Sequence, residues 1–304
     1  MWGAPGSGKT TFLGALDIAL KRRSYGLRMA GMTEASVNLL IEMTDRLVVD
    51  REFPPQTLAI DYVEWELFRQ RSADPASTSS PPSGANRITL SLVDPSGELA
   101  RAQNRSNPDR KKLIDDLADS DGILFMFDPI REFEVGDAFS TTNGLLHQLT
   151  AAIASKNRER FDGTLPQHVA ICVTKFDEPK VLETAKKLGI VNRQAHDPHQ
   201  LPWVHEHDAL RLLTALTAVS GSGDGEMLLN ALQQAFPGRI QFFVTSAVGF
   251  YVNPMTGKFD DDDPQNLVKS GPGMSRQSRI RGALYPINVV EPIVWLSEQV
   301  ANRP

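Results

Sequence analysis

The chain carries a complete phosphate-binding pattern within its first ten residues. Residues 3–10 read GAPGSGKT and match G-x-x-x-x-G-K-[ST] at every position. Glycines let backbone N–H groups turn inward around phosphate oxygens, Lys9 can reach the β- and γ-phosphates, and the Thr10 hydroxyl can ligate Mg²⁺. The residues expected to bind the phosphates are Gly3, Gly6, Ser7, Gly8, Lys9, Thr10 and Thr11. This pattern predicts a nucleoside-triphosphate site at the start of a helix.

Only Met1 and Trp2 precede this loop. A phosphate-binding loop normally follows a buried strand at the centre of a sheet, and that strand sets the position of the loop. We therefore expect the first, central strand to be missing from the chain. A late start relative to the fold explains this better than a fold built without the strand, because the rest of the pattern is intact.

Strands and helices alternate along the remainder of the chain. Apolar periodicity predicts helices over residues 11–21, 29–50, 108–119, 140–156, 206–219, 225–236 and 291–301. It predicts strands over residues 58–68, 87–93, 122–127, 168–173 and 240–244. This alternation favours an α/β fold of the three-layer P-loop NTPase type, whose sheet is mostly parallel with one antiparallel hairpin strand. We expect a single domain over residues 1–304, with a flexible insert over 72–86 and a polar loop over 253–285.

Composition excludes several classes of protein. With 32 Lys and Arg against 37 Asp and Glu, the net charge is -5, so the overall field repels nucleic acid. The lone cysteine, Cys172, excludes an intrachain disulfide framework and fits a reducing compartment. No apolar run approaches the ~20 residues needed to span a bilayer. We expect a cytoplasmic protein that neither spans a membrane nor binds nucleic acid.

A second motif, Asp94-Pro95-Ser96-Gly97, directly follows the predicted strand 87–93. An aspartate at the carboxyl end of a strand can hold the water shell of Mg²⁺, and the N–H of Gly97 can reach the γ-phosphate. The competing aspartate is Asp128, which ends the most apolar predicted strand and would serve an ATPase equally well. We prefer Asp94 as the metal residue because of its glycine and the hairpin before it.

Two further motifs at strand ends indicate which base is bound. In Thr174-Lys175-Phe176-Asp177, the carboxylate can accept both the N1–H and the exocyclic amino group of guanine, a donor pair that adenine lacks. After the strand 240–244, the backbone N–H groups of Thr245-Ser246-Ala247 would meet guanine O6. The residues expected to bind the base are Thr174, Lys175, Asp177, Ser246 and Ala247.

The order of GAPGSGKT, DPSG, TKFD and TSA resembles the TRAFAC class of P-loop GTPases over nearly the whole chain. The start WGAPGSGKT, the FPPQT segment at 53–57 and the PINVVEP segment at 286–292 are similar to bacterial double-GTPase proteins. That finer resemblance implies a role in bacterial conflict or immunity signalling.

The resemblance also implies residues that act at the γ-phosphate. The class has a switch threonine that closes over Mg²⁺; Thr57 stands in the expected place, with Thr33 as the alternative. The position after Gly97, often a water-orienting glutamine, is Glu98, whose charge would lie near that of the γ-phosphate. We therefore expect slow intrinsic hydrolysis that needs a partner, and Arg51 is a candidate arginine finger within the chain.

Together these motifs predict a GTPase that hydrolyses GTP to GDP with Mg²⁺ and acts as a conformational switch toward an unknown effector or activating protein. Lys9, Thr57 and Glu98 are the candidate catalytic residues, and Thr10, Thr57 and Asp94 the candidate metal residues. Two alternatives stay open: a nucleotide-binding scaffold that does not hydrolyse GTP, and a P-loop ATPase that uses Asp128.

Overall fold

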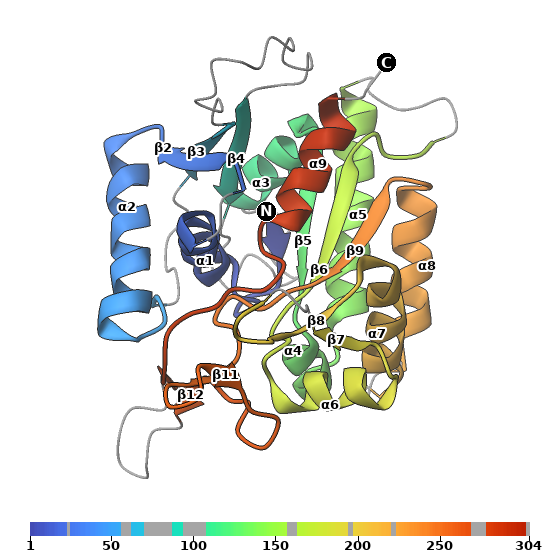
Figure 1. Cartoon of the computed structure of the whole chain (residues 1–304). Helices are drawn as coiled ribbons and strands as arrows, with labels where there is room; N and C mark the ends of the chain where they lie inside the picture. Colours follow the sequence, from blue (N-terminus) through green and yellow to red (C-terminus); the bar gives the residue numbers. More distant parts are fainter. Residues whose placement is uncertain are drawn as a thin grey trace, which may run out of the picture.

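Four parallel strands form the central sheet of the computed structural model (Figure 1). The structure describes residues 1–22, 25–55, 62–69, 87–93, 108–156, 163–193, 197–219, 223–268 and 278–301. Along the sheet the strands follow the order β1 (Trp2–Gly3), β5 (Gly122–Phe127), β6 (His168–Val173) and β9 (Ile240–Val244). The last three match the predicted strands, because each is an apolar run covered on both faces.

Helices cover both faces of this sheet. Side chains alternate between the faces, so Phe125 and Phe127 of β5 enter one core while Leu124 and Met126 enter the other. The first core is closed by α3 (Pro108–Asp119), α5 (Ala138–Ser155), α7 (Glu206–Ala218) and α8 (Gly225–Ala235). The second core is closed by α1 (Lys9–Arg22) and α9 (Glu291–Ala301). This confirms an α/β arrangement of a parallel sheet between helices.

The predicted hairpin belongs to a separate sheet. Strands β2 (Leu27–Gly31), β3 (Tyr62–Arg69) and β4 (Arg87–Val93) pair antiparallel in that order. The expectation that a hairpin strand joins the parallel sheet is therefore wrong for the described residues. Val63, Trp65 and Leu67 point from β3 into the core beneath α1 and α9, which holds the small sheet against the central one. The insert over residues 72–86 lies outside the described residues.

The predicted helix over residues 29–50 is wrong at its start and irregular at its end. Residues 29–31 belong to β2, where they pair with β3 at residues 65–67, and α2 (Glu34–Asp45) begins only after Thr33. The Thr33 side chain caps α2 by accepting from the Ser36 N–H. The helix continues as a π-helical turn, η1 (Arg46–Asp50), and Arg51 ends it in the left-handed conformation.

Short elements complete the chain. They are α4 (Pro129–Glu134), α6 (Pro179–Lys187), β7 (Val191–Arg193), β8 (Pro202–Val204), β10 (Val252–Asn253), β11 (Lys258–Phe259), β12 (Leu267–Val268) and β13 (Arg279–Ile280). The predicted polar loop over 253–285 therefore contains strand pairs, β10 with β11 and β12 with β13. In the described part of the chain, every helix is too short or too polar to cross a bilayer.

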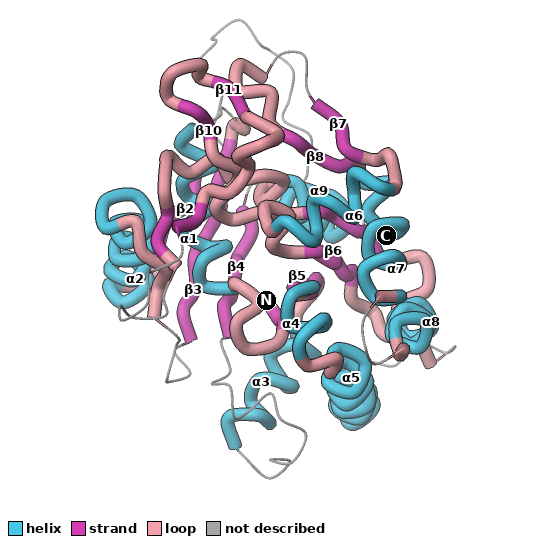
Figure 2. Tube along the Cα trace, turned by 90° about the horizontal axis from the view of Figure 1, so that it is seen from below, coloured by secondary structure: helices cyan, strands magenta, loops and turns pink. Residues whose placement is uncertain are grey.

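The residues before the phosphate-binding loop do form a strand, although a short one. Trp2 and Gly3 pair in parallel with Phe125 and Met126, and the Trp2 ring stacks on the Phe125 ring with 4.4 Å between centroids. The expectation that the first strand is missing is therefore corrected to a strand of two residues. On the other side, the Met1 amino group donates to the Ser91 carbonyl of β4 at 3.1 Å. Both views place the amino terminus between β4 and β5 (Figures 1 and 2).

Candidate nucleotide-binding site

The segment between β1 and α1 has the shape of an anion cradle. Gly6 and Gly8 adopt φ angles of +78° and +90°, which L side chains rarely tolerate, so the glycines of the pattern are required by the backbone itself. A Cβ atom on Gly3 would lie 2.7 Å from the Met126 carbonyl oxygen, because the start of the loop packs closely on β5. The glycine spacing therefore has a direct structural cause at all three positions.

Lys9 is the first residue of α1 and lies within the loop. Its ammonium donates to the carbonyl oxygens of Gly3 at 3.1 Å and Ala4 at 3.2 Å, and the side chain is buried. The first turn of α1 contains no acidic side chain, so the positive end of this 14-residue helix is not offset locally. The fully buried Ser7 hydroxyl has no hydrogen-bond partner among the described residues. These features fit a bound phosphate group.

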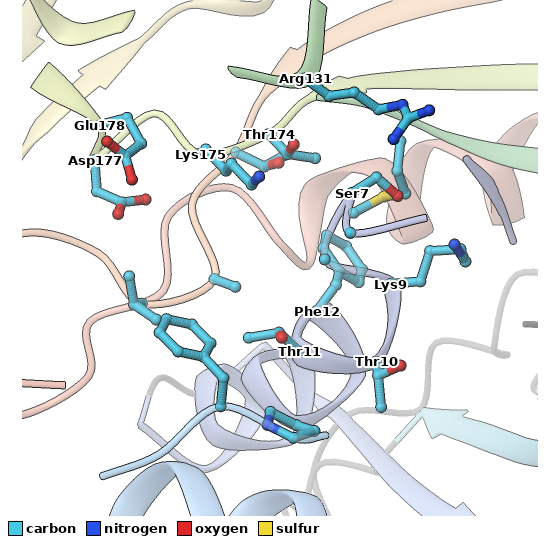
Figure 3. Close-up of a pocket in the computed structure, with 18 of the residues that line it drawn as sticks. Ser7, Lys9, Thr10, Thr11, Phe12, Arg131, Thr174, Lys175, Asp177 and Glu178 are labelled. Carbon is cyan, nitrogen blue, oxygen red and sulfur yellow. The ribbon is translucent and has the colours of Figure 1, made fainter. Parts of the chain in front are cut away.

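The third motif forms the opposite side of the site. Thr174 follows β6 and donates through its N–H and its hydroxyl to the Phe127 carbonyl oxygen, each at 2.9 Å. Lys175 adopts a positive φ of 58°, and its ammonium pairs with Asp128 at 2.6 Å. The Phe176 ring is buried beneath the loop. This turn presents Asp177 and the stem of Lys175 toward the same space as the phosphate-binding loop (Figure 3).

Asp177 is buried and supported by the fourth motif. Its carboxylate accepts a hydrogen bond from the Ser246 hydroxyl, and Ser246 in turn accepts from the Gly249 N–H at 2.8 Å. Burial raises the pKa of Asp177 to about 6, an effect that the Ser246 hydrogen bond opposes. Two hydrogen-bond donors from a ligand would stabilise the charged form of this buried carboxylate, and the edge of guanine offers two such donors.

A cavity of about 580 Å³ connects the two sides. Figure 3 shows Lys9 and Asp177 on opposite sides of it, with Thr10 and Thr11 along the helix start. The predicted residues that line the cavity are Gly6, Ser7, Gly8, Lys9, Thr10, Thr11, Thr174, Lys175, Asp177 and Ala247. Gly3 and Ser246 do not line it; Gly3 accepts from Lys9, and Ser246 supports Asp177. The volume is in the range of small-molecule sites.

Two features of the cavity were missed by sequence reasoning. Phe53, with the two prolines after it, lines the cavity near Ala247 and Val248, and thus provides an apolar wall. Arg131 of α4 also lines the cavity, and its guanidinium makes bonds of 2.9 and 2.5 Å to the two carboxylate oxygens of Asp137. That hydrogen bonding raises the pKa of Arg131. The FPP sequence before Thr57 was a signal for the first feature, whereas a lone arginine after a strand gave none for the second.

The expected γ-phosphate and metal residues Thr57, Asp94, Gly97 and Glu98 lie outside the described residues. Their roles stay predictions. Thr33, the alternative switch threonine, has a structural role as the cap of α2. Arg51 does not line the cavity, and its guanidinium donates to the Arg281 carbonyl oxygen at 2.7 Å.

Asp128, the aspartate of the ATPase alternative, is engaged within the protein. One carboxylate oxygen accepts hydrogen bonds from the N–H groups of Ile130 and Arg131, so Asp128 caps the start of α4. The other carboxylate oxygen pairs with the Lys175 ammonium. A metal-binding role would have to break these contacts in a residue that is buried. The observed bonds therefore favour a structural role for Asp128.

Comparison with known proteins identifies a family. A family model described as Double-GTPase 1 matches residues 1–175. Neither the curated proteins nor the solved structures contain a significant match to this chain. The matched region includes the phosphate-binding loop and ends at Lys175, two residues before Asp177.

Proposed function

Because the chain belongs to the Double-GTPase 1 family, whose membership implies GTP binding, we propose that it hydrolyses GTP to GDP and acts as a conformational switch. The family match agrees with the resemblance found in the sequence. The earlier similarity to bacterial double-GTPase proteins is the reason for proposing a role in conflict or immunity signalling.

One observation carries the proposal: the phosphate-binding loop and the Asp177 loop line a single cavity. A nucleoside triphosphate has a charged end and a base end, and this cavity has a matching polarity. Lys9 and the open helix start lie on one side, and a buried carboxylate lies on the other. A phosphate site alone would not need the buried Asp177 and Ser246 pair.

Catalysis in this proposal depends on position and charge rather than on a covalent intermediate. The N–H groups of the loop and the Lys9 ammonium offset the negative charge that develops on the β- and γ-phosphate oxygens. We propose that Thr10 and Asp94 hold Mg²⁺, since hydroxyl and carboxylate oxygens are the donors that this ion prefers. When bound, the ion supplies further neutralisation at the phosphates. Thr57 and Glu98 would order the switch loop and orient the attacking water.

Base selection is assigned to the other side of the cavity. Asp177 would accept from the guanine N1–H and amino group, the Ala247 region would donate to O6, and the Lys175 stem would lie against the ring. Phe53 lies where an apolar wall could contact the same ring. Adenine presents no donor pair to Asp177, so its binding would leave a buried carboxylate unsatisfied.

Single-turnover hydrolysis of bound GTP tests the proposal directly. We expect slow turnover that requires Mg²⁺ and is lost in a Lys9→Met variant. Hydrolysis no faster than in buffer, with GTP still bound, would establish the scaffold alternative.

Competition binding tests the choice of base. We expect GTP to displace a fluorescent GDP analogue at least ~100-fold better than ATP does. Equal displacement by ATP would defeat the guanine assignment and restore the ATPase alternative.

A further inference from the structure

Arg131 is a positively charged side chain of the nucleotide-binding cavity that lies outside every predicted motif. It lines the cavity together with residues 5–7 of the phosphate-binding loop. It also lines a smaller adjoining space with Ala4 of the same loop. In Figure 3 its guanidinium lies on the side of Lys9, across the cavity from Asp177. Arg131 is therefore at the end of the cavity that suits the phosphates.

Local contacts set the position of this side chain. Asp128 caps α4, so Arg131 lies in the first turn of a helix that begins directly after β5. At the start of α5, Glu132 accepts a hydrogen bond from the Ala138 N–H at 3.0 Å. Asp137 precedes α5, where an aspartate usually caps the helix, yet its carboxylate makes no such cap. That carboxylate pairs with the Arg131 guanidinium instead.

The pair with Asp137 leaves part of the guanidinium available to a ligand. Nε donates to one carboxylate oxygen at 2.9 Å, and Nη2 donates to the other at 2.5 Å. A guanidinium has five N–H donors in one plane, so Asp137 fixes that plane while it uses two of them. Nη1 makes no hydrogen bond within the part of the chain that the structure describes. Arg131 can thus keep its contact with Asp137 and donate to a phosphate oxygen at the same time.

The distribution of charge around the cavity favours a second cation at this end. A nucleoside triphosphate with one bound Mg²⁺ stays more negative than a single lysine can offset. The acidic residues of the described lining, Asp177 and Glu178, both belong to the loop on the base side, and so does Lys175. Lys9 and Arg131 are the basic residues of the described lining that lie outside that loop. They are therefore suited to share the charge of the phosphates.

We propose that Arg131 is a second phosphate-binding residue, oriented by Asp137, that donates through Nη1 to a terminal phosphate of the nucleotide. This inference rests on the proposed binding of GTP, and it adds to that site a residue outside the phosphate-binding loop. The contact joins a cation to an anion, and such hydrogen bonds are about twice as strong as neutral ones. Its loss should lower the affinity at least ~10-fold.

Equilibrium titration with a non-hydrolysable GTP analogue tests this assignment without depending on hydrolysis. Arg131→Gln should lower the affinity at least ~10-fold. Its Tm should fall by less than about 3 °C, because both side chains of the ion pair are 30% exposed.

Two control variants separate phosphate binding from other effects. Asp137→Asn breaks the same ion pair but keeps the guanidinium, so its affinity should stay within about threefold of that of the parent protein. Arg211→Gln removes an arginine of α7 that pairs with Asp208 and does not line the cavity. It should change the affinity by less than about twofold, because salt screens distant charges.

The outcomes distinguish this proposal from the proposed function. Parent-like affinity in Arg131→Gln overturns the phosphate role. An equal loss in Asp137→Asn also overturns it and assigns the ion pair a structural role, and an equal loss in Arg211→Gln assigns the effect to overall charge. If Arg131→Gln does not fold, Arg131→Lys takes its place. A lysine lacks the planar donors, so about threefold weaker binding is expected and parent-like affinity overturns the proposal. Failure of the parent protein itself to bind the analogue would defeat the proposed function as well.

Discussion

Acidification should weaken guanine binding through protonation of Asp177. The side chain is buried, and burial raises the pKa of this carboxyl to about 6. Guanine offers two donors, so it binds the ionised carboxylate and not the protonated acid. At about pH 5, with a pKa of about 6, roughly nine-tenths of the unliganded protein carries the proton. We therefore expect the affinity for GDP to fall about tenfold between about pH 7.5 and pH 5.

The assay is calorimetric titration with GDP across this pH range. Because phosphate groups also titrate near pH 6, an Asp177→Asn variant serves as the control. Its phosphate contacts are the same, so the ratio of the two affinities isolates the carboxyl group. We expect that ratio to shrink about tenfold toward pH 5. A ratio that stays constant would refute the assignment of Asp177 as the base-binding carboxylate.

The same group affects stability with a definite sign. The pKa of Asp177 in the folded protein, about 6, lies above its ordinary value of 3.8, so the folded state binds the proton more tightly than the unfolded state does. Without nucleotide, the free energy of unfolding should therefore fall as the pH rises from about 4 to 6, by about 3 kcal/mol, and then stay level. The Asp177→Asn variant should lose this dependence, which chemical denaturation at several pH values would measure.

Three substitutions test other parts of the structure. Lys9→Met should lower GTP affinity at least ~100-fold in equilibrium titration while the Tm changes little, since the apolar stem remains; near-normal affinity would contradict the assigned phosphate role. Gly249→Ala should lower the free energy of unfolding by about 3 kcal/mol or more, because a Cβ there would lie 2.0 Å from the Tyr285 carbonyl oxygen and Gly249 has a φ of +67°. An unchanged denaturation midpoint would show that this contact relaxes. Trp65→Phe should lower the free energy of unfolding by about 1 kcal/mol, since the indole N–H donates to the Ser36 carbonyl oxygen at 3.0 Å. Identical denaturation curves for the variant and the parent protein would refute this.

The central sheet was predictable because its strands are unbroken apolar runs. Residues 122–127, 168–173 and 240–244 are strands as predicted, since both faces of each are covered by helices. The segment 29–31 was not predictable in the same way. Its strand conformation comes from pairing with residues 65–67, a distant contact that local periodicity does not reveal.

In the candidate site, too, features set by local sequence were predictable, whereas features set by distant contacts were not. The glycine and lysine pattern predicted the loop because backbone geometry alone requires it. Arg131 could not be anticipated, since it reaches the cavity only because Asp128 caps α4 and Asp137 holds its guanidinium. The predicted roles of Thr57, Asp94, Gly97 and Glu98 concern residues outside the described part of the chain.

The hydrogen bond between Ser246 and Asp177 crosses the boundary of the family match. Residues 1–175 contain the phosphate-binding loop, whereas the carboxylate that we propose binds the base and the hydroxyl that supports it both lie later in the chain. Residues inside the matched region and residues beyond it thus line one cavity. We therefore expect substitutions at Ser246 to alter the preference between purines without disturbing the contacts of Lys9 in the phosphate-binding loop.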